Sequence, residues 1–176
     1  MTDARASRTA STGSQQRITL ERVYDADLQD VWDLWTTKEG IESWWGPGGF
    51  AVTVRSLDLR PGGELHYAMT ATDPPQVEFM KKAGMPLTQE LRLTYTEVVE
   101  RERLAYLHSA DFIPGVPAYD VATLVELVAT PQGVRMRLTF DAMHSEEWTQ
   151  RAVMGWESEL GKLAAVVAAR HVGRRP

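Results

Sequence analysis

Residues 145–171 read SEEWTQRAVMGWESELGKLAAVVAARH, and apolar side chains recur in this segment every three or four positions. The recurring positions are Trp148, Ala152, Val153, Trp156, Leu160, Leu163, Val166 and Val167. This spacing is typical of an amphipathic helix with one apolar stripe. Ser145 is a residue type favoured at a helix N-cap, and the helix dipole favours the two glutamates that follow it. At about 1.5 Å per residue the helix is about 40 Å long, so we expect it to cross a whole small domain.

The chain before this helix alternates apolar and polar residues over several short segments, as half-buried strands do. We expect one strand near the N-terminus, then two short helices, and then six strands. One-sided alternation predicts an antiparallel sheet with one face in solvent. The strands are expected at residues 17–24 and 50–58, in a segment that carries Leu65, Tyr67 and Met69, and at residues 90–100, 104–111, 119–130 and 134–141.

Three short helices interrupt this order. The first begins after Asp25 or Asp27, and the second is expected at residues 37–44, because Thr36 and Glu39 have the spacing of a capping box. Asp73, which two prolines follow, predicts an inserted helix at residues 74–84. The expected fold class is α+β, with the long helix lying across the sheet.

Composition indicates one globular domain, because the 176 residues are 43% hydrophobic and 24% charged. We place this domain at residues 17–171, between a disordered N-terminal tail of residues 1–16 and a C-terminal tail of residues 172–176. The net charge of −5 and the lack of a Lys or Arg run argue against a nucleic-acid partner. No segment has the pattern of a secretory signal or a membrane span, and cysteine is absent. We therefore expect a cytoplasmic protein without stable membrane insertion.

Several short motifs follow one another in a characteristic order. They are Tyr24-Asp25-Ala26 leading to Val31 and Trp32, then Trp44-Trp45-Gly46-Pro47, Asp58 with Arg60-Pro61-Gly62-Gly63, Val98-Val99 with Arg103-Leu104, and Gly155-Trp156. In this order they resemble the branch of activator-of-heat-shock-protein-90-ATPase homologues in the START-like (SRPBCC) superfamily, over residues 17–170. The resemblance implies the helix-grip fold, in which a seven-stranded antiparallel sheet curves around the C-terminal helix and often encloses an apolar cavity. The segment at residues 71–89 departs from the compact members.

Candidate ligand-binding residues are those that the alternation points toward the space between sheet and helix. Tyrosine and histidine there can orient a mostly apolar ligand by hydrogen bonds. For each residue the alternative is an ordinary place in the core. The candidates are Trp45, Tyr67, Met69, Met80, Tyr95, Tyr106, His108, Tyr119, Met136, Phe140 and Trp156.

Two of these candidates have a specific alternative. Met80 is either part of a lid, since methionine adapts to varied apolar shapes, or it plugs the open end of the sheet from a surface helix. Trp45 either stacks on a ligand at the mouth of the cavity or seals the edge of the core together with Trp44.

Catalytic and metal sites have little support. His108 with Glu78 or Glu90 is the only acid/base pairing that the pattern suggests, and we assign no catalytic residue. The four histidines lack the spacing of a zinc site and no cysteine is available, so we expect neither metal nor cofactor.

Three functions follow from these observations. The first is binding of a small hydrophobic or aromatic ligand. The second is a cofactor-free enzyme of the cyclase or hydrolase kind, which turnover that depends on His108 would favour. The third is regulation of a chaperone ATPase through outer-face residues such as Arg92, Arg135 and Arg137. The sequence has no counterpart of the chaperone-binding N-terminal domain of eukaryotic activators, so we expect a chaperone partner less than a ligand. A homodimer stays open, because an edge strand or the turn at Trp44-Trp45-Gly46-Pro47 could support one.

Overall fold

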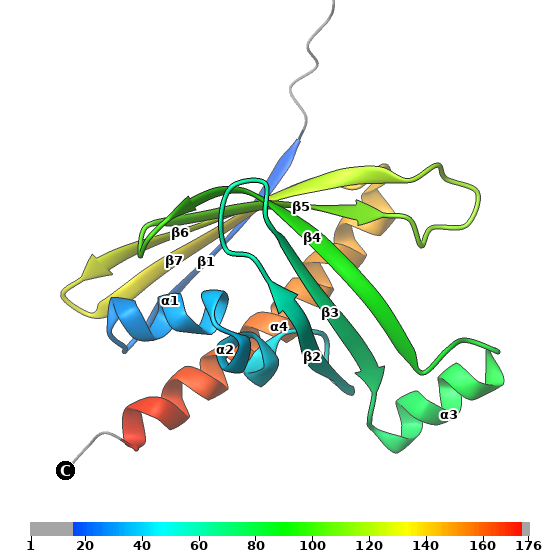
Figure 1. The fold of residues 1–176 in the computed structure, drawn as a ribbon, viewed down its shortest axis with the longest axis horizontal. Helices are drawn as coiled ribbons and strands as arrows, with labels where there is room; N and C mark the ends of the chain where they lie inside the picture. Colours follow the sequence, from blue (N-terminus) through cyan, green and yellow to red (C-terminus); the bar gives the residue numbers. More distant parts are fainter. Residues whose placement is uncertain (1–15, 174–176) are drawn as a thin grey trace, which may run out of the picture.

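A long helix, α4 (Glu146–Val172), runs diagonally across a seven-stranded antiparallel sheet in the computed structural model, which describes residues 16–173 (Figure 1). Ser145 caps the helix as predicted, because its side chain accepts a hydrogen bond from the backbone N–H of Trp148. Leu160, Leu163 and Val167 are buried against the sheet. Residues 1–15 of the predicted N-terminal tail and residues 174–176 of the C-terminal one lie outside the described residues.

The sheet has the strand order β1-β7-β6-β5-β4-β3-β2, so the first strand lies beside the last one. It twists strongly from β7 to β2, which lets it curve around α4 (Figure 1). The strands are β1 (Arg17–Tyr24), β2 (Phe50–Leu57), β3 (Glu64–Ala71), β4 (Thr88–Val99), β5 (Arg103–Ala110), β6 (Tyr119–Thr130) and β7 (Gly133–Asp141). The predicted α+β helix-grip architecture is confirmed, with strand ends within two residues of those expected.

Two short helices, α1 (Leu28–Thr36) and α2 (Lys38–Trp44), connect β1 to β2 and complete the core. The predicted capping residue was wrong by one position. The Thr37 side chain accepts from Gly40 N, whereas the hydroxyl of Thr36 donates to the carbonyl of Trp32 inside α1. The chain turns between Thr36 and Lys38, so Thr37 alone has the extended backbone that an N-cap needs.

The inserted helix α3 (Pro74–Lys82) lies between β3 and β4, beyond their ends and away from α4 (Figure 1). Met80 is its buried residue, with 3% of its surface exposed, while Phe79 is 61% exposed. Glu78 forms an ion pair with Lys82 on the same helix. The helix therefore buries one side chain fully and leaves most of the others in solvent.

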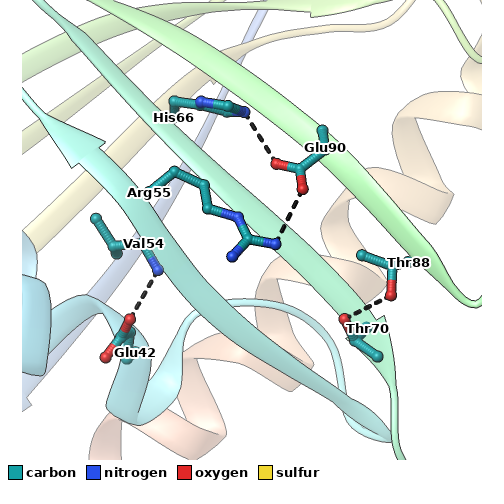
Figure 2. Close-up of polar contacts among 7 residues, drawn as sticks. All are labelled: Glu42, Val54, Arg55, His66, Thr70, Thr88 and Glu90. Atoms are coloured by element: carbon teal, nitrogen blue, oxygen red, sulfur yellow. Dashed lines mark hydrogen bonds and ion pairs between the residues drawn. The ribbon is translucent and has the colours of Figure 1, made fainter.

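The outer face of the sheet carries paired charges. Glu90 lies 3.1 Å from Arg55 Nη2 and 2.9 Å from His66 Nε2, and the Arg55 hydrogen bond lowers the pKa of Glu90 (Figure 2). Glu42 of α2 accepts a hydrogen bond from Val54 N at 2.7 Å, which satisfies a backbone donor of the edge strand β2 (Figure 2). Arg55, His66 and Glu90 thus form a small polar network on the outer face of the sheet.

Candidate functional site

A cavity of about 230 Å³ lies between α4 and the inner face of the sheet, and we call it the helix–sheet pocket. Strands β3 to β7 form its floor, α4 forms one wall, and Trp45 closes the end next to α2. Gly155 contributes open space, because a Cβ atom at this position would have no neighbour within 4 Å. The lining residues are Trp45, Tyr67, Leu93, Tyr106, His108, Phe112, Val121, Phe140, Met143, Ala152, Gly155, Trp156 and Glu159.

Trp45 is the aromatic residue around which the pocket wall is arranged. Its ring centroid lies 6.2 Å from that of Tyr67, 6.1 Å from that of Tyr106 and 6.4 Å from that of Trp156. Lys162 of α4 holds the end of α2 in place, since its Nζ donates to the carbonyl oxygens of Trp45 at 3.5 Å and Gly46 at 2.9 Å. A contact between two helices therefore positions the aromatic wall.

Two tyrosines place hydroxyl groups in this aromatic surrounding. Burial raises the pKa of Tyr67 to about 12 and that of Tyr106 well above its usual value, so both hydroxyls stay protonated at neutral pH. Tyr106 is 2% exposed, and its hydroxyl lies next to that of Thr123, its register partner on β6, without a hydrogen bond of regular geometry among the described residues. A buried hydroxyl without a well-formed hydrogen bond costs free energy, so Tyr106 has hydrogen-bonding capacity to offer a ligand.

Glu159 brings a carboxylate into the same pocket. Burial raises the pKa of Glu159 to about 7, and the nearby positive charge of Lys162 opposes the shift. No hydrogen bond or ion pair to Glu159 occurs within residues 16–173. Sequence reasoning missed this residue, although the signal was present: Glu159 follows Gly155 by four positions and Trp156 by three, which places it on the same helix face.

His108 is a further titratable group of the pocket, and the structure pairs it with neither of the two glutamates considered for an acid/base pair. Its strand partners are Leu93 and Val121, which also line the pocket. Glu90 is three positions from Leu93 on β4 and therefore points to the opposite face, and Glu78 lies on α3. Burial lowers the pKa of His108, while Asp120 raises it, so the imidazole is neutral at pH 7.

Six of the eleven predicted ligand-binding residues line the pocket: Trp45, Tyr67, Tyr106, His108, Phe140 and Trp156. Met136 is fully buried in the core, Tyr95 packs edge-on against Tyr106, and Met69 lies near the turn at Gly46. These three are on the expected face but do not reach the cavity. The alternation along a strand predicts which face of the sheet a side chain points to. It does not predict whether that side chain lines a cavity or is enclosed by its neighbours.

Met80 and Tyr119 are the other two predicted residues that do not line the pocket. Met80 is buried on α3, outside the helix–sheet pocket. The hydroxyl of Tyr119 accepts a hydrogen bond from His144 N at 3.1 Å and lies 3.7 Å from the sulfur of Met143. Tyr119 thus fastens the segment that leads into α4.

A wider surface hollow of about 790 Å³ lies where α1, the turn between β6 and β7, and the end of α4 meet. Its border includes exposed side chains such as Asp25, which lies 3.7 Å from His171. Ligand sites combine apolar walls with a few convergent polar groups, a description that fits the helix–sheet pocket and not this hollow. Within residues 16–173 no group of three or more His, Asp or Glu residues is arranged to hold a metal ion. No described helix has the length and apolarity to cross a membrane.

The strongly twisted sheet closed by one long helix defines a helix-grip domain of the START-like class. The family model for Activator of Hsp90 ATPase homolog 1-like protein matches residues 25–168, and the chain belongs to this family. Comparison with the curated proteins found no match.

Solved structures share the fold. A protein from Chromobacterium violaceum is 24% identical with a TM-score of 0.70, and the match covers 86% of this chain and 96% of that one. The AHSA1-like protein from Aeromonas hydrophila is 22% identical with a TM-score of 0.67, covering 92% and 98%. The AHSA1 protein from Silicibacter pomeroyi is 19% identical with a TM-score of 0.68, covering 89% and 100%. At these identities the likeness shows the fold alone.

Proposed function

We propose that the chain binds a small aromatic or otherwise hydrophobic molecule in the helix–sheet pocket. The observation that carries this proposal is the lining itself, in which aromatic side chains surround a small number of polar groups. Tyr67, Tyr106, His108 and Glu159 are the residues with polar groups that converge there. Such a lining supplies binding free energy through apolar burial and orientation through a few hydrogen bonds.

The volume of the pocket suits a ligand of about one or two rings. At about 230 Å³ the cavity is smaller than the roughly 300–1,000 Å³ typical of sites for drug-sized molecules. Small ligands gain at most about 1.5 kcal/mol per heavy atom, and larger ones much less. We therefore expect dissociation constants between about 1 μM and 1 mM for simple aromatic compounds.

The test uses untagged full-length protein, native mass spectrometry and a thermal-shift screen of one- and two-ring aromatic compounds. A bound molecule, or a saturable rise in melting temperature, supports the proposal. Gly155→Leu places a side chain in the pocket and should abolish binding. Gly161→Leu is the matched control, because Gly161 is exposed on α4 and lies outside the pocket lining. Binding that survives Gly155→Leu would contradict the proposal.

A chaperone partner is a second candidate, because the family description refers to activation of a chaperone ATPase. Of the arginines considered for such a contact, Arg92 pairs with Glu64 at 3.2 Å and Arg137 lies 3.5 Å from Glu21. A partner would have to compete with these ion pairs. Stimulation of a chaperone ATPase that Arg92→Glu abolishes and Gly155→Leu leaves intact would favour this function over ligand binding.

The cytoplasmic location and the homodimer stay predictions.

A further inference from the structure

The carboxylate of Glu159 is unusual among the acidic groups of the domain, because it borders a cavity and has no ion pair within residues 16–173. Lys162, one turn further along α4, is the nearest cation that influences it. The ammonium group of Lys162, however, donates hydrogen bonds to the carbonyl oxygens of Trp45 and Gly46, and these bonds hold it at the end of α2. Glu159 therefore has acceptor capacity that the protein itself does not use.

The walls next to Glu159 suit a cation. Trp45, Trp156 and Tyr67 border the cavity, and the faces of aromatic rings attract positive charge. The Tyr106 hydroxyl lies next to that of Thr123 and makes no hydrogen bond of regular geometry within the described residues, and a hydroxyl can accept as well as donate a hydrogen bond. Carboxylate, ring faces and hydroxyl together form a surrounding in which an ammonium group has several acceptors.

We propose that the ligand of the helix–sheet pocket is an aromatic amine in its protonated form, whose ammonium group donates to Glu159 while its ring packs against Trp45 and Trp156. This inference rests on the proposed function, namely that the pocket holds an aromatic ligand. It narrows the ligand from hydrophobic molecules in general to those with one ring system and a short cationic side chain.

The other titratable groups around Glu159 do not cancel its charge. Tyr67 on β3 and Tyr106 on β5 stay neutral, since burial raises the pKa of both hydroxyls. His108 on β5 is neutral at pH 7, because burial lowers its pKa, and Asp120 on β6 is exposed and outside the lining. Among residues 16–173, Lys162 on α4 supplies the opposing charge that acts on Glu159, and its amino group faces the end of α2.

This arrangement predicts a pH dependence with a definite sign. Burial raises the pKa of Glu159 to about 7, so about one tenth of the free protein carries the carboxylate form at pH 6 and about nine tenths at pH 8. An ammonium ligand selects the carboxylate form. Its affinity should therefore rise about tenfold from pH 6 to pH 8, and its binding should release protons.

The experiment is isothermal titration of the full-length protein with 2-phenylethylamine and with 2-phenylethanol, which has nearly the same shape and no charge. Hydrogen bonds to charged groups are stronger than neutral ones, so the amine should bind about tenfold more tightly than the alcohol at pH 8. Glu159→Gln keeps the shape and removes the charge. It should bring the amine down to the affinity that the alcohol has for the same variant.

Two results would overturn the inference while leaving the proposed function in place: equal affinity for amine and alcohol in the wild type, or an amine preference that survives Glu159→Gln. Absence of binding for both compounds, together with no hit in the thermal-shift screen, would overturn the proposed function as well. The melting temperature of Glu159→Gln, measured alongside, confirms that the variant is folded.

Discussion

Replacement of Gly155 by alanine should stabilise the protein, because the pocket leaves room for the added methyl group. Gly155 lies inside α4, where glycine costs about 1 kcal/mol relative to alanine. A Cβ atom there would meet nothing within 4 Å, so no steric cost offsets the gain. We expect the free energy of unfolding to increase by about 1 kcal/mol and the melting temperature to rise by about 2–4 °C.

Gly161→Ala is the matched control. Gly161 lies in the same helix, is exposed, and also has no neighbour within 4 Å of the added atom. Guanidinium denaturation of both variants gives the change in unfolding free energy from the midpoint and slope. Equal stabilisation by the two changes is the expected result. If Gly155→Ala were destabilising while Gly161→Ala stabilised, the space beside Gly155 would be closed by packing and the pocket would not exist as described.

Three further predictions concern residues around the pocket and the inserted helix. Glu159 has a pKa raised to about 7 in the folded protein against about 4.5 in the unfolded chain, so its contribution to stability is lost as pH rises between these values. The unfolding free energy of Glu159→Gln should therefore exceed that of wild type at pH 8 by up to about 3 kcal/mol and match it near pH 4.5. A constant difference across this pH range would refute the assignment of the raised pKa to Glu159. Lys162→Met removes two hydrogen bonds to the end of α2 and should lower the free energy of unfolding, measured by chemical denaturation, by about 1–2 kcal/mol. The control Lys82→Met breaks an exposed ion pair with Glu78 and should change this free energy little. Similar effects of the two variants would argue that Lys162 does not hold the end of α2. Met80→Ala should lower the free energy of unfolding by about 2–5 kcal/mol and leave ligand affinity unchanged, and the control Phe79→Ala should have nearly no effect on stability. A loss of ligand affinity in Met80→Ala would instead support the interpretation of α3 as a lid.

The sequence was sufficient for the fold because each element carries its own periodic signal. The stripe from Trp148 to Val167 requires a helix with one buried face, and β6 alternates through Val121, Thr123 and Val125, all of which are buried. Local rules failed only in detail. Thr36 and Thr37 are adjacent and both have hydroxyls, so spacing alone could not decide which of them begins α2.

The pocket was harder to predict, because its lining depends on how the side chains of different elements pack in three dimensions. Tyr95 and Tyr106 are cross-strand partners with the same alternation, yet only Tyr106 reaches the cavity. Glu159 was missed because an acidic residue beside an apolar helix stripe is usually at the solvent edge. Phe112 and Met143 belong to connections without periodicity, and the tertiary fold alone brings them to the mouth of the pocket.

The most direct test of ligand binding in the helix–sheet pocket is a titration of the ¹⁵N-labelled full-length protein with 2-phenylethylamine, followed by NMR of the backbone amides and the tryptophan indoles. The account predicts saturable shift changes at Trp45, Tyr106, Trp156 and Glu159, with little change at Asp25 and Gln132 in the surface hollow. Changes confined to the surface hollow, or changes that do not saturate, would contradict it.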